Sequence, residues 1–234
     1  MPRQMVRRPI QDTPVWQAYN RKRYAILFYS LLLTMIAMPV VTTFGLPAVL
    51  IRLLLAASLF AAVMPNATRR TRVTLFVVVL FLVALRWLAD YDLIPLNPGL
   101  MPALIGLVGL IAAAGALSFL VNSRDVDSET LHAALGTYLL AGVFFGQIYW
   151  ALESAWPGSL VGPDPVTQLS AIYYSFVTLA TLGYGDFLPR TDIARGVATF
   201  EVIGGQLFLA VMVARLVSLY SRGRNPTDSI SAKR

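Results

Sequence analysis

Long apolar runs separated by short polar segments make up most of the chain from residue 24 onward. Six of these runs approach the roughly 20 residues that an α-helix needs to cross the hydrocarbon core of a bilayer. Lipid offers no hydrogen-bond partner to a bare backbone, so such runs predict transmembrane helices. The expected spans are residues 24–41, 46–64, 73–91, 98–120, 130–152 and 195–220.

A further apolar segment, residues 166–180, is shorter than the six spans and follows a polar stretch at 153–165. It is too short to cross the bilayer comfortably. We expect a re-entrant half-helix, capped by Asp164 or Thr167, with Pro165 at its first position. Non-helical backbone at membrane depth is tolerated only where protein or a water-filled cavity supplies its hydrogen bonds. The segment therefore indicates a pore or a binding cavity.

Most basic residues fall on one side of the expected membrane, and only Arg190 and Arg195 lie in the opposite loops. The majority occupy the N-terminal segment, two loops and the tail, whereas the opposite loops are mainly acidic. The basic positions are Arg3, Arg7, Arg8, Arg21, Lys22, Arg23, Arg69, Arg70, Arg72, Arg124, Arg222, Arg224, Lys233 and Arg234. The positive-inside rule then predicts that both termini are cytoplasmic, which six crossings and one re-entrant segment satisfy. The first span is expected to be closed by Pro39 and by the turn at residues 42–45.

Composition narrows the possible functions. The 234 residues are 57% hydrophobic and 13% charged, which is about half the charge of a typical soluble domain. The chain has no cysteine and one histidine, His132, so a disulfide framework, a thiolate or multi-histidine metal site and a cysteine nucleophile are excluded. An intramembrane enzyme lacks support. The net charge of +7 is attributed to membrane topology rather than to nucleic acid binding.

Residues 181–186, which follow the half-helix, read Thr-Leu-Gly-Tyr-Gly-Asp. Glycine tolerates positive φ, so Gly183 and Gly185 allow successive carbonyl groups of an extended strand to point the same way. Four such strands around one axis would stack rings of carbonyl oxygens that replace the water shell of a monovalent cation. Thr181 would add a ring of hydroxyls, and Tyr184 would brace the strand from behind. The alternative is an ordinary extracellular turn.

The same six residues resemble the potassium channel signature Thr-Val-Gly-Tyr-Gly-Asp, with Leu182 in place of Val. Tyr173 and Tyr174 stand where that family has aromatic residues on its pore helix, and Gly205 stands where many members have a hinge glycine. Phe187-Leu188-Pro189 is similar to the segment by which the chain leaves the filter. The resemblance covers about residues 130–220 and implies an outer helix, a pore helix, a filter and an inner helix.

The resemblance also implies supporting roles for residues around the filter, and the chain differs from the family pattern at one of these positions. Gly185, Asp186, Tyr173, Tyr174 and Thr178 are expected to support the filter and its outer mouth, where Asp186 would concentrate cations. Ala180 stands where many members carry a second threonine, and this difference is expected to affect filter stability or inactivation.

Two explanations are open for the paired glycines in the last span. Gly204 and Gly205 would permit a bend that opens the pore, or they would allow close helix packing, for which small residues are common in membranes.

Two polar residues also lie in the last span. An ionisable side chain is expensive in a membrane and is usually partnered, so Glu201 is expected to form a hydrogen bond behind the pore helix, to Thr178 or Ser175. A role in the ion path is the alternative. Gln206 is a candidate cavity-lining group.

The fourth span contains no charged residue, whereas a voltage sensor needs several Arg or Lys at every third position. Arg52, Arg86 and Asp90 are scattered over the second and third spans. We therefore expect weak intrinsic voltage dependence. The expected domains are a basic cytoplasmic segment at 1–23, a four-helix membrane domain at 24–120 without an Arg-rich sensor, a pore domain at 130–220 and a short cytoplasmic tail at 221–234.

These expectations describe an all-α membrane protein with six transmembrane helices, a re-entrant pore helix and a filter, assembled as a homotetramer in contact with membrane lipids. Its expected function is passive, selective K⁺ conduction, with the ion coordinated at Thr181, Leu182, Gly183 and Tyr184, mainly by backbone carbonyls. No resident cofactor, nucleic acid partner or cytoplasmic ligand domain is expected. The expected location is the plasma membrane, multi-pass, of a prokaryote. The alternatives are a weakly selective cation channel, a non-conducting regulatory subunit and an ion-coupled transporter.

Overall fold

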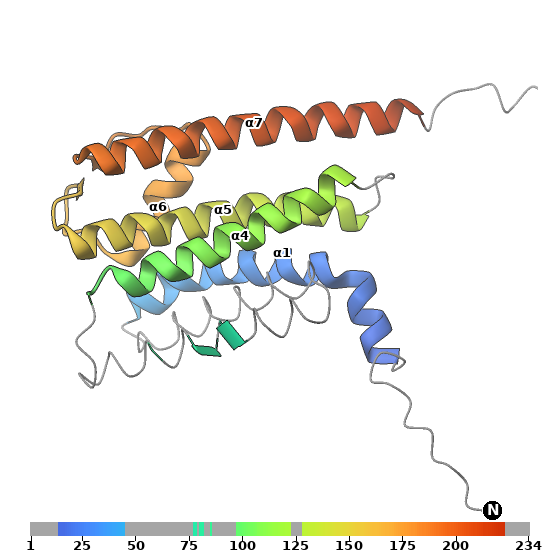
Figure 1. The fold of residues 1–234 in the computed structure, drawn as a ribbon, viewed down its shortest axis with the longest axis horizontal. Helices are drawn as coiled ribbons and strands as arrows, with labels where there is room; N and C mark the ends of the chain where they lie inside the picture. The colour runs from blue at the N-terminus through green and yellow to red at the C-terminus, as the bar shows by residue number, and fades with distance from the viewer. Residues whose placement is uncertain are drawn as a thin grey trace, which may run out of the picture.

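The computed structural model describes residues 14–44, 77–78, 80–81, 85, 97–122 and 128–222, and these residues are almost entirely helical. The expected span 46–64, most of the span 73–91 and the tail from residue 223 lie outside the described residues, as do Arg52, Arg86 and Asp90. The elements are α1 (Pro14–Thr43), α4 (Leu100–Asn122), α5 (Ser128–Ala155), β1 (Leu160–Val161), α6 (Gln168–Leu179), β2 (Leu188–Pro189) and α7 (Asp192–Arg222) (Figure 1).

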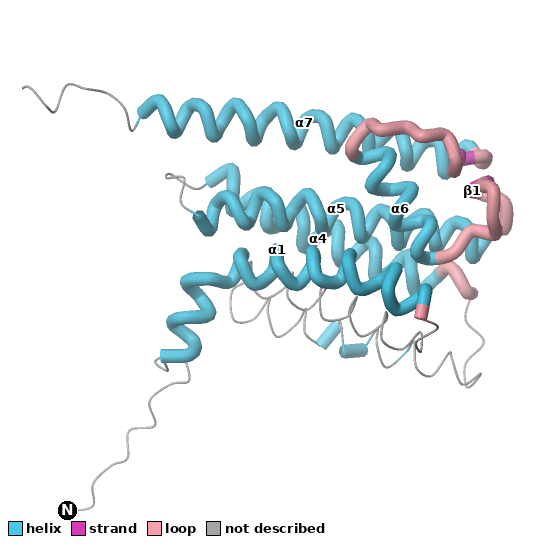
Figure 2. Tube along the Cα trace, turned by 180° about the vertical axis from the view of Figure 1, so that it is seen from behind, coloured by secondary structure: helices cyan, strands magenta, loops and turns pink. Residues whose placement is uncertain are grey.

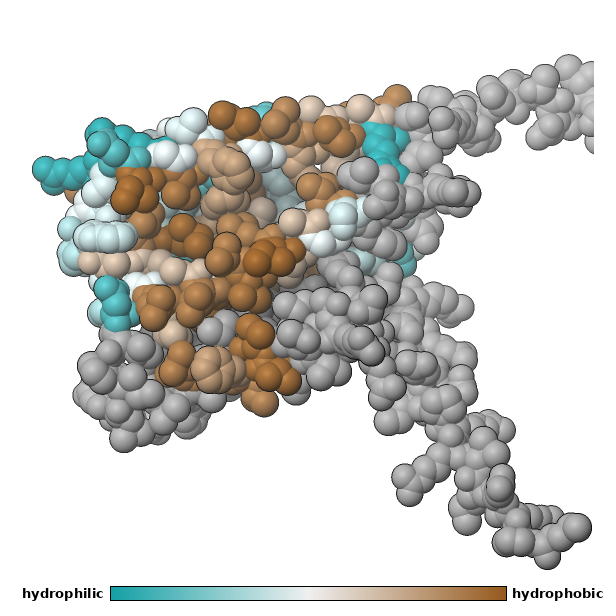
Figure 3. Space-filling model, viewed as in Figure 1, coloured by the Kyte–Doolittle hydropathy of each residue, from teal (hydrophilic) through white to brown (hydrophobic). Residues whose placement is uncertain are grey.

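Three of these helices contain segments long and apolar enough to cross a membrane, namely Tyr24–Val41, Ser128–Ala155 and Asp192–Arg215. A shorter apolar stretch, Leu100–Gly115, lies in α4. On the face shown in Figure 3, hydrophobic side chains cover the middle, and hydrophilic ones gather where α7 begins. The described chain is therefore an all-α membrane fold.

Helix α1 ends at Thr43, within the expected turn of residues 42–45, but Pro39 lies inside the helix and does not end it. Membrane helices tolerate proline because neighbouring groups and small local adjustments satisfy the freed carbonyl. At the other end, the first turns of α1 run at an angle to the rest (Figure 1). The Tyr24 amide donates a hydrogen bond to Oε2 of Glu129, at 3.0 Å. The contact joins α1 to the first turn of α5.

Helix α5 lies at the centre of the described fold, with α1, α4 and α6 packed against it and α7 alongside (Figures 1 and 2). One apolar cluster joins α1, α4, α5 and α7. Its buried members are Tyr24, Leu27, Leu31, Ala112, Ala113, Ala133, Ala134, Leu140, Phe144 and Met212. The helices approach closely where glycine replaces a side chain, because a Cβ on Gly109 would lie 2.1 Å from the Phe144 ring. Such small residues are typical of helix contacts in membranes.

A second apolar cluster lies at the loop end of the molecule and joins α5, β1, α6 and α7. Its buried members are Tyr149, Leu152, Leu160, Ala171, Tyr174 and Ala194. Helix α6 lies between α5 and α7 at this end, close to the loops before and after it (Figure 2). This cluster fixes the short helix between the two long ones.

Candidate functional site

Helix α6 begins at Gln168, capped by Thr167, one of the two expected caps. The Thr167 hydroxyl accepts from the Ser170 amide at 3.1 Å, and the Ser170 hydroxyl accepts from the Thr167 amide at 2.7 Å. The prediction that Pro165 occupies the first helical position was wrong, because this reciprocal capping box defines a later start.

Helix α6 packs against two glycines of α5, where the absence of a side chain leaves room for atoms of α6. A Cβ on Gly142 would lie 2.4 Å from the Phe176 ring, and one on Gly146 would lie 2.6 Å from the Ile172 Cα. At the start of α6, Gln168 Nε2 donates to Gln147 Oε1 at 2.9 Å. These contacts fix the position of α6 against α5.

The loop after α5 is organised by a carboxylate that sequence reasoning did not single out. Glu153 Oε1 accepts from the Gly158 amide and Oε2 accepts from the Leu160 amide, both at 2.9 Å. The loop then forms strand β1, which pairs antiparallel with β2, so that Leu160 lies opposite Pro189. The chain that leaves residues 181–186 is therefore tied to the end of α5. Two-residue strands carry almost no periodic signal, which is why the sequence did not predict them.

The backbone of residues 181–185 alternates in the sign of φ. Thr181, Gly183 and Gly185 have φ of 57°, 57° and 78°, and Leu182 and Tyr184 are not among the positive-φ residues. The glycines were expected at such positions, but Thr181 was not, because a β-branched residue rarely adopts positive φ. Alternation of this kind turns successive carbonyl groups toward the same side of the strand.

This strand begins directly at the end of α6. Ala180 caps the helix, and the Leu182 amide donates to the Val177 carbonyl at 2.9 Å. Residues 180–186 are all exposed in the single chain, and a Cβ on Gly183 or Gly185 would meet nothing within 4 Å. The glycines are therefore required by backbone conformation and not by space within one chain.

The two expected aromatic residues of α6 point to different neighbours. The Tyr173 ring lies edge to face with the Phe187 ring, with ring centroids 6.2 Å apart. Tyr174 is buried and stacks edge to face on Tyr149, with ring centroids 4.8 Å apart. Tyr173 thus connects α6 with the outer end of the strand, and Tyr174 anchors α6 to α5.

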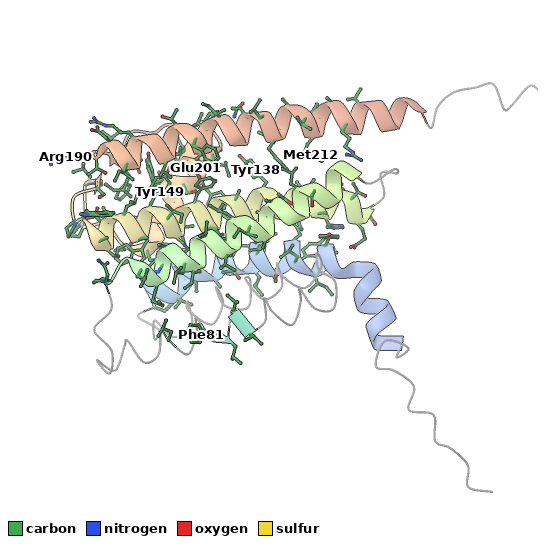
Figure 4. All side chains as sticks on the ribbon, in the orientation of Figure 1. Phe81, Tyr138, Tyr149, Arg190, Glu201 and Met212 are labelled. Atoms are coloured by element: carbon green, nitrogen blue, oxygen red, sulfur yellow. The ribbon has the colours of Figure 1, made fainter. Side chains whose placement is uncertain are left out.

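Glu201 is fully buried between α5, α6 and α7 (Figure 4). Its Oε2 accepts from the Tyr149 hydroxyl at 2.7 Å, and its Oε1 lies in a short contact with Oγ of Ser175. Ser175 Oγ is also 2.8 Å from the carbonyl oxygen of Gly142. The expected contact with Ser175 is present, and Tyr149 is a partner that the sequence analysis missed. We call these four residues the Glu201 cluster.

Helix α7 is continuous through Gly204 and Gly205. A Cβ on Gly205 would lie 2.7 Å from Cδ1 of Leu179, at the end of α6, whereas one on Gly204 would meet nothing within 4 Å. Close packing therefore accounts for Gly205, and a hinge at this pair stays a prediction. Gln206 is exposed on α7.

Comparison with known proteins finds channel sequences that are similar to part of this chain. Residues 135–222 match a family model described as "Ion channel". The chain is 32% identical over 99 residues to the inward rectifier potassium channel Kirbac3.1 of Paramagnetospirillum magnetotacticum. This match covers 41% of this chain and 30% of the relative. It is 39% identical over 60 residues to the putative potassium channel protein RPA4233 of Rhodopseudomonas palustris. This match covers 26% of this chain and 15% of the relative.

A plant relative gives the same result. The chain is 38% identical over 92 residues to the two pore potassium channel c of Oryza sativa, covering 38% of this chain and 19% of the relative. No solved structure matches. The chain thus spans less than a third of each of these relatives, which are named as potassium channels or, for one of them, as a putative potassium channel. The expected resemblance to the potassium channel family is confirmed for this part of the chain.

Proposed function

We propose that four copies of this chain, whose residues 135–222 match the ion channel family, form a potassium-selective pore. In this proposal α5 is the outer helix, α6 the pore helix, residues 181–185 the filter and α7 the inner helix. K⁺ passes down its gradient and is coordinated at Thr181, Leu182, Gly183 and Tyr184, mainly by backbone carbonyls.

The observation that carries the proposal is the alternating sign of φ along residues 181–185. A strand with alternating φ presents its carbonyl oxygens on one side, and such a row suits a dehydrated cation. One strand cannot surround an ion. Several chains must therefore converge, and four strands around one axis give the closed rings that the proposal requires.

The exposed surface of α7 supports this assembly. Glu201, Gly205 and Met212 lie on the buried face of α7, and Glu201 and Gly205 contact α5 and α6. The opposite face carries exposed Phe200, Ile203, Leu207 and Val211 at helical spacing. In the proposed tetramer this second face, which is exposed in a single chain, would contact neighbouring copies or line the pore.

The membrane topology belongs to the same proposal. The six spans, the cytoplasmic termini and a prokaryotic plasma membrane rest on charge placement along the sequence. Helices α5 and α7 would be the fifth and sixth spans, and α1 and α4 the first and fourth. We propose that residues 24–120 act as a scaffold, because α4 carries no charged residue.

The experiment is a flux assay with purified protein in liposomes. K⁺ flux through the wild type is expected to exceed Na⁺ flux strongly, and Gly183→Ala or Tyr184→Ala is expected to abolish or reduce it. Gly136→Ala is the control, because its Cβ would make only an ordinary contact, 3.5 Å from Leu27, and its helical backbone accepts alanine. Unchanged flux in both filter variants would overturn the filter assignment.

The other candidate functions are outcomes of the same assay. Comparable K⁺ and Na⁺ fluxes that depend on Gly183 would identify a weakly selective cation channel. Absence of flux from a correctly folded tetramer would identify a non-conducting subunit, and flux that requires a second coupled ion would identify a transporter.

A further inference from the structure

The Glu201 cluster contains three oxygen–oxygen contacts but only two hydroxyl groups. The contacts join Tyr149 Oη to Glu201 Oε2, Ser175 Oγ to Glu201 Oε1, and Ser175 Oγ to the carbonyl oxygen of Gly142. A hydroxyl group supplies one proton, whereas a carbonyl oxygen and an ionised carboxylate supply none. If Glu201 is ionised, the hydroxyl protons of Tyr149 and Ser175 can form hydrogen bonds in only two of the three contacts. In the remaining contact two oxygen atoms would face each other with no proton between them.

A proton on Oε1 of Glu201 resolves this deficit. The acid then donates to Ser175 Oγ, the Ser175 hydroxyl donates to the Gly142 carbonyl, and the Tyr149 hydroxyl donates to Oε2. Each contact receives one proton. The Gly142 carbonyl can accept this bond in addition to its helical one, because a carbonyl oxygen has two lone pairs.

The surroundings favour the neutral form for an independent reason. Glu201 is 0% exposed, and a buried charge is costly unless it is paired. Among the residues that the structure describes, the titratable groups facing Glu201 are the phenols of Tyr138 and Tyr149 on α5 and of Tyr174 on α6. The described ion pair on α7, Arg195 with Asp192, is exposed. No cation is paired with Glu201 in this part of the chain.

We propose that Glu201 is a neutral carboxylic acid in the folded protein and acts as a hydrogen-bond donor to Ser175. The acid, the serine hydroxyl and the Gly142 carbonyl then form one relay that joins α7, α6 and α5 behind residues 181–185. Glu201 is thereby a positioning residue for the pore helix. Its effect on conduction rests on the proposed channel function, whereas its protonation does not.

The protonation state is tested by infrared difference spectroscopy of the purified protein in lipid at neutral pH. Glu201→Gln is expected to remove a carbonyl stretch of an un-ionised carboxylic acid. Glu153→Gln is the matched control, because the two Glu153 oxygens both accept backbone amides, as an ionised carboxylate does. It is expected to remove carboxylate bands only. If Glu201→Gln instead removes carboxylate bands, the proposal is wrong.

A second variant keeps the test valid if Glu201→Gln folds poorly. Tyr149→Phe removes the hydrogen bond to Oε2, the carbonyl oxygen of the proposed acid. The acid stretch is therefore expected to move to higher wavenumber in Tyr149→Phe, and an unchanged acid stretch would contradict the proposed arrangement.

The positioning role is tested by K⁺ flux as a function of pH. Glutamine can donate to Ser175 and accept from Tyr149, so Glu201→Gln is expected to conduct like the wild type at neutral pH, while Glu201→Leu conducts less. Rising pH removes the proton, so wild-type flux is expected to fall in alkaline medium and Glu201→Gln flux to stay constant. Loss of flux in Glu201→Gln equal to that in Glu201→Leu would overturn the role. A wild type without K⁺ flux would refute the channel function and leave the infrared result standing.

Discussion

Alanine at Gly146 tests how closely α6 is fixed to α5. A Cβ there would lie 2.6 Å from the Ile172 Cα, so α6 has to move by about 0.8 Å to restore ordinary contact in a closely packed interior. Overpacking of this kind costs about 1–3 kcal/mol, and the helix propensity of alanine returns about 1 kcal/mol. We expect Gly146→Ala to lower the stability of the protein by up to about 2 kcal/mol, and to reduce K⁺ flux because the proposed filter begins where α6 ends.

Gly136→Ala is the matched control on the same helix. Its Cβ would lie 3.5 Å from Leu27, an ordinary contact, so only the propensity gain of about 1 kcal/mol applies. Thermal unfolding of the purified proteins in detergent is expected to place Gly146→Ala several degrees below Gly136→Ala. Equal melting temperatures and equal flux would refute the close-packing argument.

The contacts at the loop end and the lack of charged residues in α4 lead to three more predictions. Thr167→Ala removes the N-cap of α6 and is expected to cost about 1 kcal/mol; the Ser170 amide should exchange its hydrogen faster, while Thr167→Ser should leave the exchange unchanged. Glu153→Ala is expected to accelerate exchange at the Gly158 and Leu160 amides, and exchange no faster than in the exposed loop variant Asp164→Ala would contradict the role of the carboxylate. Because α4 has no charged residue, patch-clamp recordings are expected to give a small gating charge; a steep intrinsic conductance–voltage curve would exclude the scaffold role.

The helices of the described fold could largely be predicted from apolar run length. Helix α5 was expected at 130–152 and spans Ser128–Ala155, and α4 was expected at 98–120 and spans Leu100–Asn122. The errors lie where a polar side chain or a neighbouring helix decides the boundary. Pro39 stays inside α1, and the Thr167–Ser170 capping box starts α6 after Pro165.

Only part of the candidate site could be predicted from the sequence. The two glycines of residues 181–185 signal positive φ by their identity, but Thr181 does not. A buried glutamate in an apolar span predicts a partner, and Ser175 was one of two expected partners. Tyr149 lies 52 positions away from Glu201, and no local pattern connects them. Glu153 was unpredictable for a similar reason, because its partners are backbone amides, which any residue provides.

In the proposed pore, carbonyl oxygens of residues 181–184 from four chains surround potassium ions on one axis. The most direct measurement is an experimental density map of the assembled protein in lipid, recorded in K⁺ and again in Na⁺. We expect fourfold symmetry and a row of ion densities between the carbonyl oxygens of Thr181 to Tyr184 in K⁺. A map that shows this strand away from a central axis, or a number of chains other than four, would contradict the account.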